Sequence, residues 1–306
     1  MNWRIKGIVQ KLLSGIPGGM RANDLLQRSV GELRHFDSTV DSKVVDDWLV
    51  LAGHLRALDR PIRDLKMLEI GTGWFPTLPF CFFLAGAAEC HTFDLYRHLS
   101  DKDTQRMIRR LQAHLPALAE AAVRPVEEVK AAYAGLDTRS ATAALRSAGI
   151  TYHAPADAAS TGLPPGSIDV AFSNSVLEHV PRDVIQALFH EQCRILKPGG
   201  LSVHSVNCGD HYAYFDRSLN PVRYLTYSDR EWSFWNNDLL YQNRLRPRDF
   251  LEMASTAGLE LALVKFTPKA ALLRELPRLR IAKRFEGYSP EELCTTSIDF
   301  VARRPG

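Results

Sequence analysis

The stretch "MLEIGTGWFP", Met67 to Pro76, decides the fold of this chain. Apolar residues run into Glu69 and then into two glycines, Gly71 and Gly73. This pattern is typical of a buried strand followed by a loop that passes close to a nucleotide. A dinucleotide fingerprint has a third glycine at the position where Pro76 stands. The missing glycine disfavours a nicotinamide cofactor and the hydride transfer that such a cofactor supports.

Outward from this stretch, the chain alternates strand patterns with helix patterns. We expect helices at residues 77–88, 182–196 and 248–257. We expect strands at residues 66–70, 90–94, 150–153, 168–173, 201–206, 259–266 and 297–302. Such alternation predicts an α/β fold: a Rossmann-like, seven-stranded, mostly parallel sheet with helices on both faces.

Several segments interrupt the alternation. Residues 1–65 read as a helical N-terminal segment, and the α/β domain then spans residues 66–306. Within that domain we expect inserts at about residues 97–148, 208–246 and 268–295. Ligands of open α/β sheets bind beyond the carboxyl ends of the strands. We therefore expect the inserts to cap the sheet rather than to form a second domain.

The composition excludes several classes of protein. A net charge of +3 over 306 residues does not indicate a nucleic-acid partner. The five cysteines are an odd number without a CxxC spacing, which favours reduced thiols in the cytoplasm and predicts no metal site. No window approaches the roughly 18 apolar residues of a membrane span. Residues 1–16 could form an amphipathic helix that touches a membrane, although packing on the chain's own domain is favoured.

More motifs follow the glycine loop. Asp94 ends the second predicted strand, 21 residues beyond Gly73. Further along stand "APADA" at residues 154–158, "SIDVAFSNSVLEHV" at 167–180 and "RILKPGGLSVHSVN" at 194–207. With these motifs, the chain resembles the class I S-adenosylmethionine-dependent methyltransferases over about residues 66–207 and the last two strands.

The resemblance implies S-adenosylmethionine as the cofactor and a set of residues that bind it. These are Glu69 anchoring the loop, Gly71 and Gly73 beside the amino-acid part, Asp94 on the ribose, Ala156 and Asp157 on the adenine, and Ser173 and Asn174 at the methionine end. Phe75 departs from the family pattern, since many members have a glycine there, and this puts the local shape of the loop in question.

Methyl transfer requires an aligned acceptor and, for a hydroxyl, a group that removes its proton. His211 follows the fifth strand and is the first candidate for this base, with His179 after the fourth strand as the second. Asp210 is the third candidate. His204 lies inside a strand and reads as a core histidine.

The composition of residues 208–246 suggests the kind of acceptor. Nine aromatic residues occur there: Tyr212, Tyr214, Phe215, Tyr224, Tyr227, Trp232, Phe234, Trp235 and Tyr241. Flat rings among polar side chains suit a saccharide or a planar acceptor, and they equally suit the core of a small capping lobe. A basic run over residues 269–284 is either a solvated face or an attraction for an anionic acceptor.

The sequence therefore favours O-methylation of a small or medium polar acceptor such as a saccharide. N-methylation is the nearest alternative, although "SNSV" at residues 173–176 replaces the N/D-P-P-Y/F run of many amino-group methyltransferases. A protein that kept the fold and the cofactor without turnover is the alternative from another class. A dehydrogenase ranks third because of Pro76.

Overall fold

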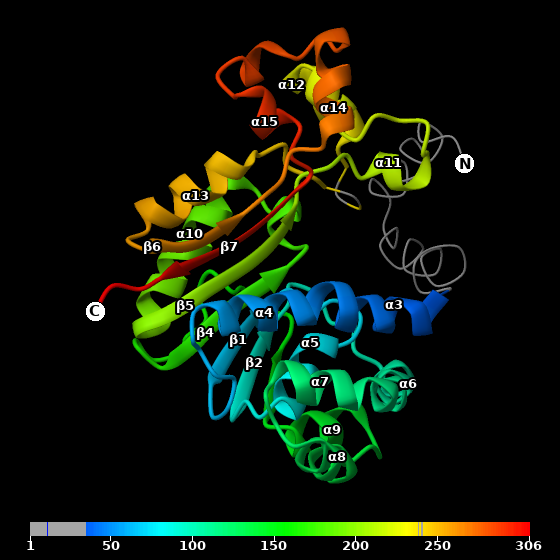
Figure 1. Ribbon diagram of the computed structural model, residues 1–306, viewed down its shortest axis with the longest axis vertical. Helices are drawn as coiled ribbons and strands as arrows, with labels where there is room; N and C mark the ends of the chain where they lie inside the picture. The colour runs from blue at the N-terminus through cyan, green and yellow to red at the C-terminus, as the bar shows by residue number, and fades with distance from the viewer. Residues whose placement is uncertain (1–10, 12–34, 238, 240) are drawn as a thin grey trace.

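A computed structural model describes residues 11, 35–237, 239 and 241–306. Its centre is one seven-stranded sheet with the order β3-β2-β1-β4-β5-β7-β6, seen in Figure 1. The strands are β1 Lys66–Ile70, β2 Glu89–Phe93, β3 Ile150–His153, β4 Ile168–Asn174, β5 Leu196–Asn207, β6 Glu260–Lys265 and β7 Ser297–Arg303. Only β7 runs antiparallel to its neighbours. The predicted Rossmann-like, mostly parallel sheet is confirmed.

Helices cover both faces of the sheet. The α-helices before β4 are α3 Phe36–Ser42, α4 Leu49–Ala57, α5 Thr77–Leu84, α6 Asp101–Leu111, α7 Leu115–Ala121, α8 Val126–Ala134 and α9 Ala141–Ser147. Those after β4 are α10 Arg182–Ile195, α11 Tyr212–Phe215, α12 Asp229–Trp235, α13 Pro247–Thr256, α14 Ala270–Glu275 and α15 Pro290–Leu293. A π-helical turn, η2 Lys43–Trp48, joins α3 to α4, and short 3-10 turns include η4 Leu177–His179.

Alternate residues of the strands divide the core into two parts, as the pleat of a sheet requires. Met67 packs with α3 to α7 on one face, whereas Leu68 packs with α10 and α13 on the other.

Two predicted boundaries were wrong. The helix after the glycine loop ends at Leu84, not at residue 88, because the chain turns at Gly86 with φ +105°. Strand β5 begins at Leu196, so the "KPGG" run lies within the strand.

The helices of residues 36–57 belong to the core of the sheet. Val40, Val44 and Trp48 recur at every fourth position and are fully buried. The Trp48 ring lies against Phe82 of α5, with centroids 5.7 Å apart. Figure 1 shows α4 lying across one face of the sheet. Residues 1–16, for which we expect an amphipathic helix that packs on the chain's own domain rather than on a membrane, lie outside the described residues, apart from Lys11.

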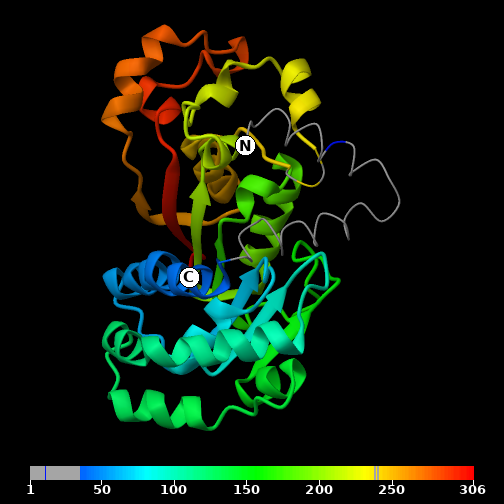
Figure 2. The same ribbon diagram turned by 90° about the vertical axis from the view of Figure 1, so that its right-hand side faces the viewer.

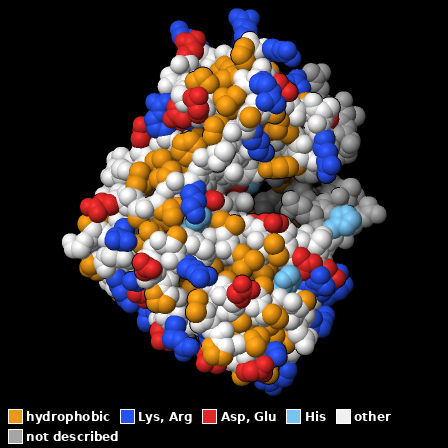
Figure 3. Space-filling view, viewed as in Figure 1, with side chains coloured by type: hydrophobic (Ala, Val, Ile, Leu, Met, Phe, Trp, Pro, Cys, Tyr) orange, Lys and Arg blue, Asp and Glu red, His pale blue; other side chains and the backbone are white. Residues whose placement is uncertain are grey.

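The first of the expected inserts forms α6 to α9, beside α5 on the same side of the sheet (Figures 1 and 2). The second and third inserts join in one small lobe with its own core, which contains Tyr224, Trp232, Phe285 and Leu293. We call this lobe, which consists of residues 208–246 and 268–295, the cap lobe. Figure 3 shows a hollow where the cap lobe meets the body of the molecule.

Among the described residues, no helix combines the length and apolar character needed to cross a bilayer.

Candidate donor and acceptor site

The loop after β1 uses its two glycines in different ways. Both have a left-handed backbone, with φ +83° at Gly71 and +67° at Gly73. A Cβ atom on Gly71 would lie 2.4 Å from Cγ2 of Val176, so this glycine is needed for packing against the loop after β4. A Cβ atom on Gly73 would meet nothing within 4 Å. The backbone of Gly73 is therefore open to a ligand, as the predicted donor site requires.

Asp94, directly after β2, holds this loop in place. Its Oδ2 accepts a hydrogen bond from the N–H of Gly73 at 2.8 Å, and its Oδ1 accepts one from the N–H of Tyr96 at 2.9 Å. Each carboxylate oxygen has two lone pairs, so the group keeps the capacity to accept from further hydroxyls. The predicted ribose ligand thus lies directly beside the predicted glycine of the donor loop.

Glu69 lies inside the sheet, below the loop. Its carboxyl group accepts a hydrogen bond from the Thr92 hydroxyl, which in turn lies 2.5 Å from the hydroxyl of Thr72. Thr72 stands between the two glycines, so this chain of hydrogen bonds ties the loop to β1 and β2. Burial raises the pKa of Glu69 to about 8, against the opposing effects of Thr92 and Lys43.

The adenine residues lie in the loop after β3. The resemblance implies that the backbone N–H of Ala156 binds the adenine. In the structure this N–H donates to the carbonyl of Asp94 at 2.9 Å, so it is already engaged within the fold. Asp157 is exposed, and its Oδ1 accepts from the N–H of Ala159 at 2.8 Å.

At the end of β4 the two predicted residues lie differently. The Ser173 hydroxyl is fully buried and lies 2.7 Å from Nδ1 of His204, so it points into the core and leaves only its backbone for the donor. Burial lowers the pKa of His204 to about 3, in keeping with its expected place in the core. Asn174 is half-buried and faces the helices of residues 36–57.

Those helices contribute two charged residues that the sequence analysis missed. Asp47 lies near Asn174, and burial raises its pKa above the ordinary value. Lys43 acts electrostatically on both Asp47 and Glu69. The signal was present in the sequence, since each charged residue follows a buried valine of the helical stripe by three positions. The residues nearest the mouth of β4 thus come partly from the N-terminal segment.

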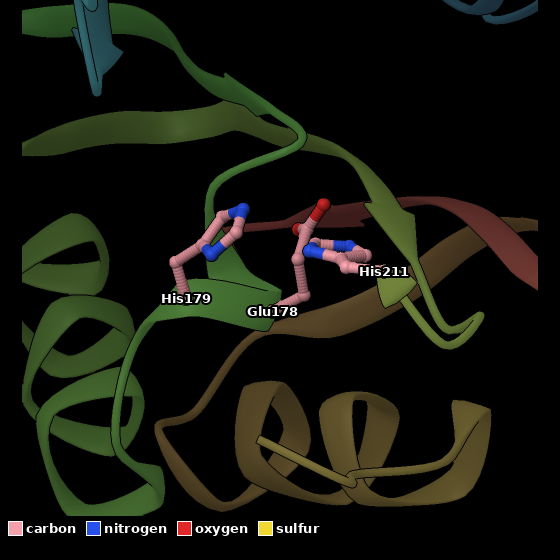
Figure 4. Close-up of side chains that lie close together, drawn as sticks. All are labelled: Glu178, His179 and His211. Carbon is pink, nitrogen blue, oxygen red and sulfur yellow. The ribbon is translucent and has the colours of Figure 1, made fainter. Parts of the chain in front are cut away.

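Beyond Val176 lies a cluster of three titratable side chains, shown in Figure 4. Glu178 and His179 come from η4, and His211 directly precedes α11. The atoms with which they could bind a ligand all lie within 4.8 Å of one another. His179 and His211, predicted from separate motifs, are brought together with ring centroids 4.8 Å apart. Glu178 was not predicted, although it adjoins His179 in the "LEHV" run.

Residues 241–243 hold this cluster in position. Nδ1 of His179 lies 2.7 Å from the carbonyl oxygen of Tyr241. The Gln242 side chain accepts from the N–H of His211 at 3.1 Å and donates to the carbonyl of Gly209. The Asn243 amide donates to the carbonyls of Leu177, the first residue of η4, and Val180, the residue after it, at 2.7 and 2.8 Å. One strand-like segment of the cap lobe therefore fixes both histidines.

Asp210 lies beside His211 in the sequence but outside this cluster. It is 4% exposed, and its Oδ1 accepts from the N–H of Tyr212 at 2.9 Å. Burial raises the pKa of Asp210 to about 7. The carboxyl group thus shapes the turn that starts α11.

A family model described as a methyltransferase domain matches residues 117–204. The match spans β3, β4, α10 and most of β5, and the glycine loop and Asp94 lie at the same edge of the same sheet. The chain carries a class I S-adenosylmethionine-dependent methyltransferase domain. The cofactor is S-adenosylmethionine, which supplies an activated methyl group when bound. The fit of the donor site rests on the open backbone of Gly73 and the carboxylate beside it.

Solved structures similar to the methyltransferase domain catalyse different reactions. An S-adenosylmethionine-dependent methyltransferase from Mesorhizobium loti is 21% identical, with 82% of this chain and 96% of that chain covered and a TM-score of 0.45. A geranyl diphosphate C-methyltransferase from Streptomyces coelicolor is 13% identical, with 88% and 82% covered and a TM-score of 0.47. A [4+2]-cyclase is 14% identical, with 84% and 80% covered and a TM-score of 0.42. A search of curated proteins finds no match. These likenesses say nothing about the acceptor.

The aromatic residues of the methyltransferase's cap lobe divide into two groups. Tyr224 and Trp232 are buried in the lobe core, as expected if the rings form the core of a capping lobe. Tyr214, in contrast, is 63% exposed. The Tyr214 ring lies 5.7 Å from that of His211. The basic run is exposed at most of its positions, and Arg284 forms an ion pair with Asp229 at 2.5 Å.

Proposed function

We propose that this methyltransferase transfers a methyl group to a hydroxyl oxygen of a small polar acceptor, such as a saccharide. The observation that carries the proposal is the cluster of Glu178, His179 and His211 at the carboxyl edge of β4 and β5. This cluster is joined to the donor loop through the contact between Gly71 and Val176. The acceptor loses its proton at this cluster while its oxygen forms the new bond to the methyl carbon.

The surroundings of the cluster support a polyhydroxyl acceptor. Tyr214 presents an exposed ring beside His211, and flat rings stack on the apolar faces of sugars while polar groups take their hydroxyls. Asn207 donates to the Tyr214 hydroxyl and so lies at the same place. The cap lobe forms one wall of this region.

The test is a transfer assay with labelled S-adenosylmethionine and a panel of matched hydroxyl and amino acceptors, for example a glycoside and the corresponding amino sugar. We expect the label in an O-methyl ether. His211→Ala should lower kcat by roughly 10²- to 10⁴-fold, because it disrupts the cluster that promotes loss of the hydroxyl proton. Tyr214→Ala should instead raise KM for the acceptor.

Donor affinity separates this role from a structural one. Calorimetry with S-adenosylhomocysteine should give the same Kd for His211→Ala and for the wild type, because His211 serves the acceptor. Label found only in N-methyl products would overturn the proposal. Full activity of His211→Ala on hydroxyl acceptors would remove this residue from the site.

A further inference from the structure

Glu178 is an unusual carboxylate. It is 2% exposed, and neither of its oxygens makes a hydrogen bond of good geometry, although the backbone N–H groups of Glu178 and Asn207 lie close enough to interact with it. A buried carboxyl group normally has such partners, because burial without them is costly. Figure 4 shows this carboxyl group directed toward the ring of His211, with the ring of His179 on the same side of η4. The unsatisfied oxygens are thus directed into a group of imidazoles rather than into an apolar core.

His179 is oriented as histidines that bind metals are oriented. Its Nδ1 lies 2.7 Å from the carbonyl oxygen of Tyr241, which can only accept a hydrogen bond. Nδ1 therefore carries the proton, and in the neutral ring Nε2 carries the lone pair. A hydrogen bond from one ring nitrogen to a backbone carbonyl is the common way in which a metal-binding histidine is held.

We propose that Glu178, His179 and His211 bind a divalent transition-metal ion. Two imidazoles and one carboxylate are a frequent ligand set for such ions, and they leave further coordination positions open. Metal–nitrogen bonds are about 2.0–2.1 Å long. The three ligand atoms, which all lie within 4.8 Å of one another, close around the ion by small rotations of the side chains. The sequence predicted no metal site because the cysteines lack a ligand spacing, and this reasoning did not extend to the histidines.

The part that this ion plays in catalysis rests on the proposed function. An ion with open positions binds the acceptor hydroxyl and lowers its pKa. The hydroxyl proton leaves to solvent, the O–CH₃ bond forms, and the S–CH₃ bond breaks with its electron pair remaining on sulfur. The products are the methyl ether and S-adenosylhomocysteine. His211 then acts as a ligand that positions the ion, and no imidazole has to take up the proton.

Cobalt(II) tests the site directly, since its visible absorption reports the ligands that bind it. The full chain, without a histidine tag and freed of metal with a chelator, should bind one Co²⁺ per chain, and Zn²⁺ should displace it. Glu178→Gln preserves the shape of the side chain and should weaken Co²⁺ binding by about 100-fold or more. His211→Asn should do the same.

The matched control is His91→Gln. Nδ1 of His91 lies 3.0 Å from Nε2 of His153, with Glu89 nearby, and this half-buried pair is the competing place for a metal. The control variant should bind Co²⁺ like the wild type. Thermal unfolding without metal should show that all the variants are folded.

Two results would overturn the inference: no stoichiometric Co²⁺ binding by the folded wild type, or binding that survives Glu178→Gln and is lost in His91→Gln. Other results would reject the proposed function and the metal site independently of each other. Co²⁺ binding without transfer to any hydroxyl acceptor would keep the metal site and reject O-methylation. Undiminished O-methylation in the presence of chelator, with no Co²⁺ bound, would reject the metal site alone.

Discussion

At the scale of single residues, Asp94 has two tasks that one carboxylate can perform together. It fixes the donor loop through the N–H of Gly73, and we propose that it also accepts hydrogen bonds from the ribose hydroxyls. Asp94→Ala removes charge-assisted hydrogen bonds worth about 1.5–3 kcal/mol each. We expect calorimetry to show S-adenosylhomocysteine affinity reduced by roughly 10²- to 10⁴-fold. An unchanged affinity would contradict the assignment of Asp94 to the ribose.

Gly73 provides a second test of the donor site. Gly73→Val places a branched side chain where the backbone is now open, and we expect a folded protein with little affinity for the donor. Gly199 is the matched control, because it has φ +75° and no atom within 4 Å of its Cβ position, yet lies near the amino end of β5. Gly199→Val should carry a similar backbone strain without loss of donor binding, as calorimetry can check.

Glu69 makes stability depend on pH. Burial raises its folded pKa to about 8 from an ordinary value of 4.5. The folded state holds the proton of Glu69 more tightly than the unfolded state does. The contribution of this proton to the free energy of unfolding is therefore complete below about pH 4.5 and is lost as the pH rises through about 8. Relative to Glu69→Gln, the wild type should lose up to about 1.4 kcal/mol of unfolding free energy per pH unit in this window. Denaturant titrations of both proteins measure it, with Glu260→Gln at an exposed position as the control. Parallel curves for wild type and Glu69→Gln would show that the carboxyl is not held neutral.

At the scale of elements, Arg246 ties the two parts of the cap lobe together beside the end of β5. Its side chain is fully buried and donates to the carbonyl of Cys208 at 2.8 Å, to the Tyr224 hydroxyl at 2.9 Å and to the carbonyl of Glu292 at 3.0 Å. The planar guanidinium reaches the end of β5 and both parts of the cap lobe at once. The lobe is therefore held by backbone carbonyls around one cation.

Arg246→Met leaves these carbonyls without their donor, each at a cost of about 1–3 kcal/mol. We expect faster hydrogen exchange throughout the cap lobe and a loss of about 3 kcal/mol or more in the free energy of unfolding. Arg248→Met is the control, because Arg248 is exposed and pairs with Glu292 at the surface. Surface pairs of this kind contribute at most about 1 kcal/mol. Equal effects of the two substitutions would contradict the role of Arg246.

At the scale of the whole molecule, residues 36–57 are part of the methyltransferase domain's core. Trp48→Ala should lower the free energy of unfolding by about 3–5 kcal/mol, the usual cost of a large cavity. The entire chain should unfold in the same single transition, since Trp48 contacts the helix that follows the donor loop. Val45→Ala, on the exposed side of the same turn, should have little effect. An early, separate transition of the N-terminal helices would show that they fold independently.

The seven strands and the glycine loop could be predicted because both are local patterns. The pattern is recognisable within a short stretch of sequence: a buried strand, two glycines and a carboxylate 21 residues later. The boundaries at Leu84 and Leu196 could not be predicted in this way, because the helix end and the strand start depend on a turn and on pairing with β4. Ser173 was expected at the methionine end of the donor, but its hydroxyl points toward His204 of the neighbouring strand β5.

The sequence by itself determined the fold class and the position of the glycine loop after the first strand, since hydrophobic alternation and glycine spacing are properties of adjacent residues. Only the tertiary structure decided that Lys43 and Asp47 reach the end of β4 and that Glu178 joins His179 and His211. These residues come from segments far apart in the chain. Their meeting depends on how helices 36–57 and the cap lobe pack on the sheet, and that packing is settled by the burial of side chains across the whole molecule.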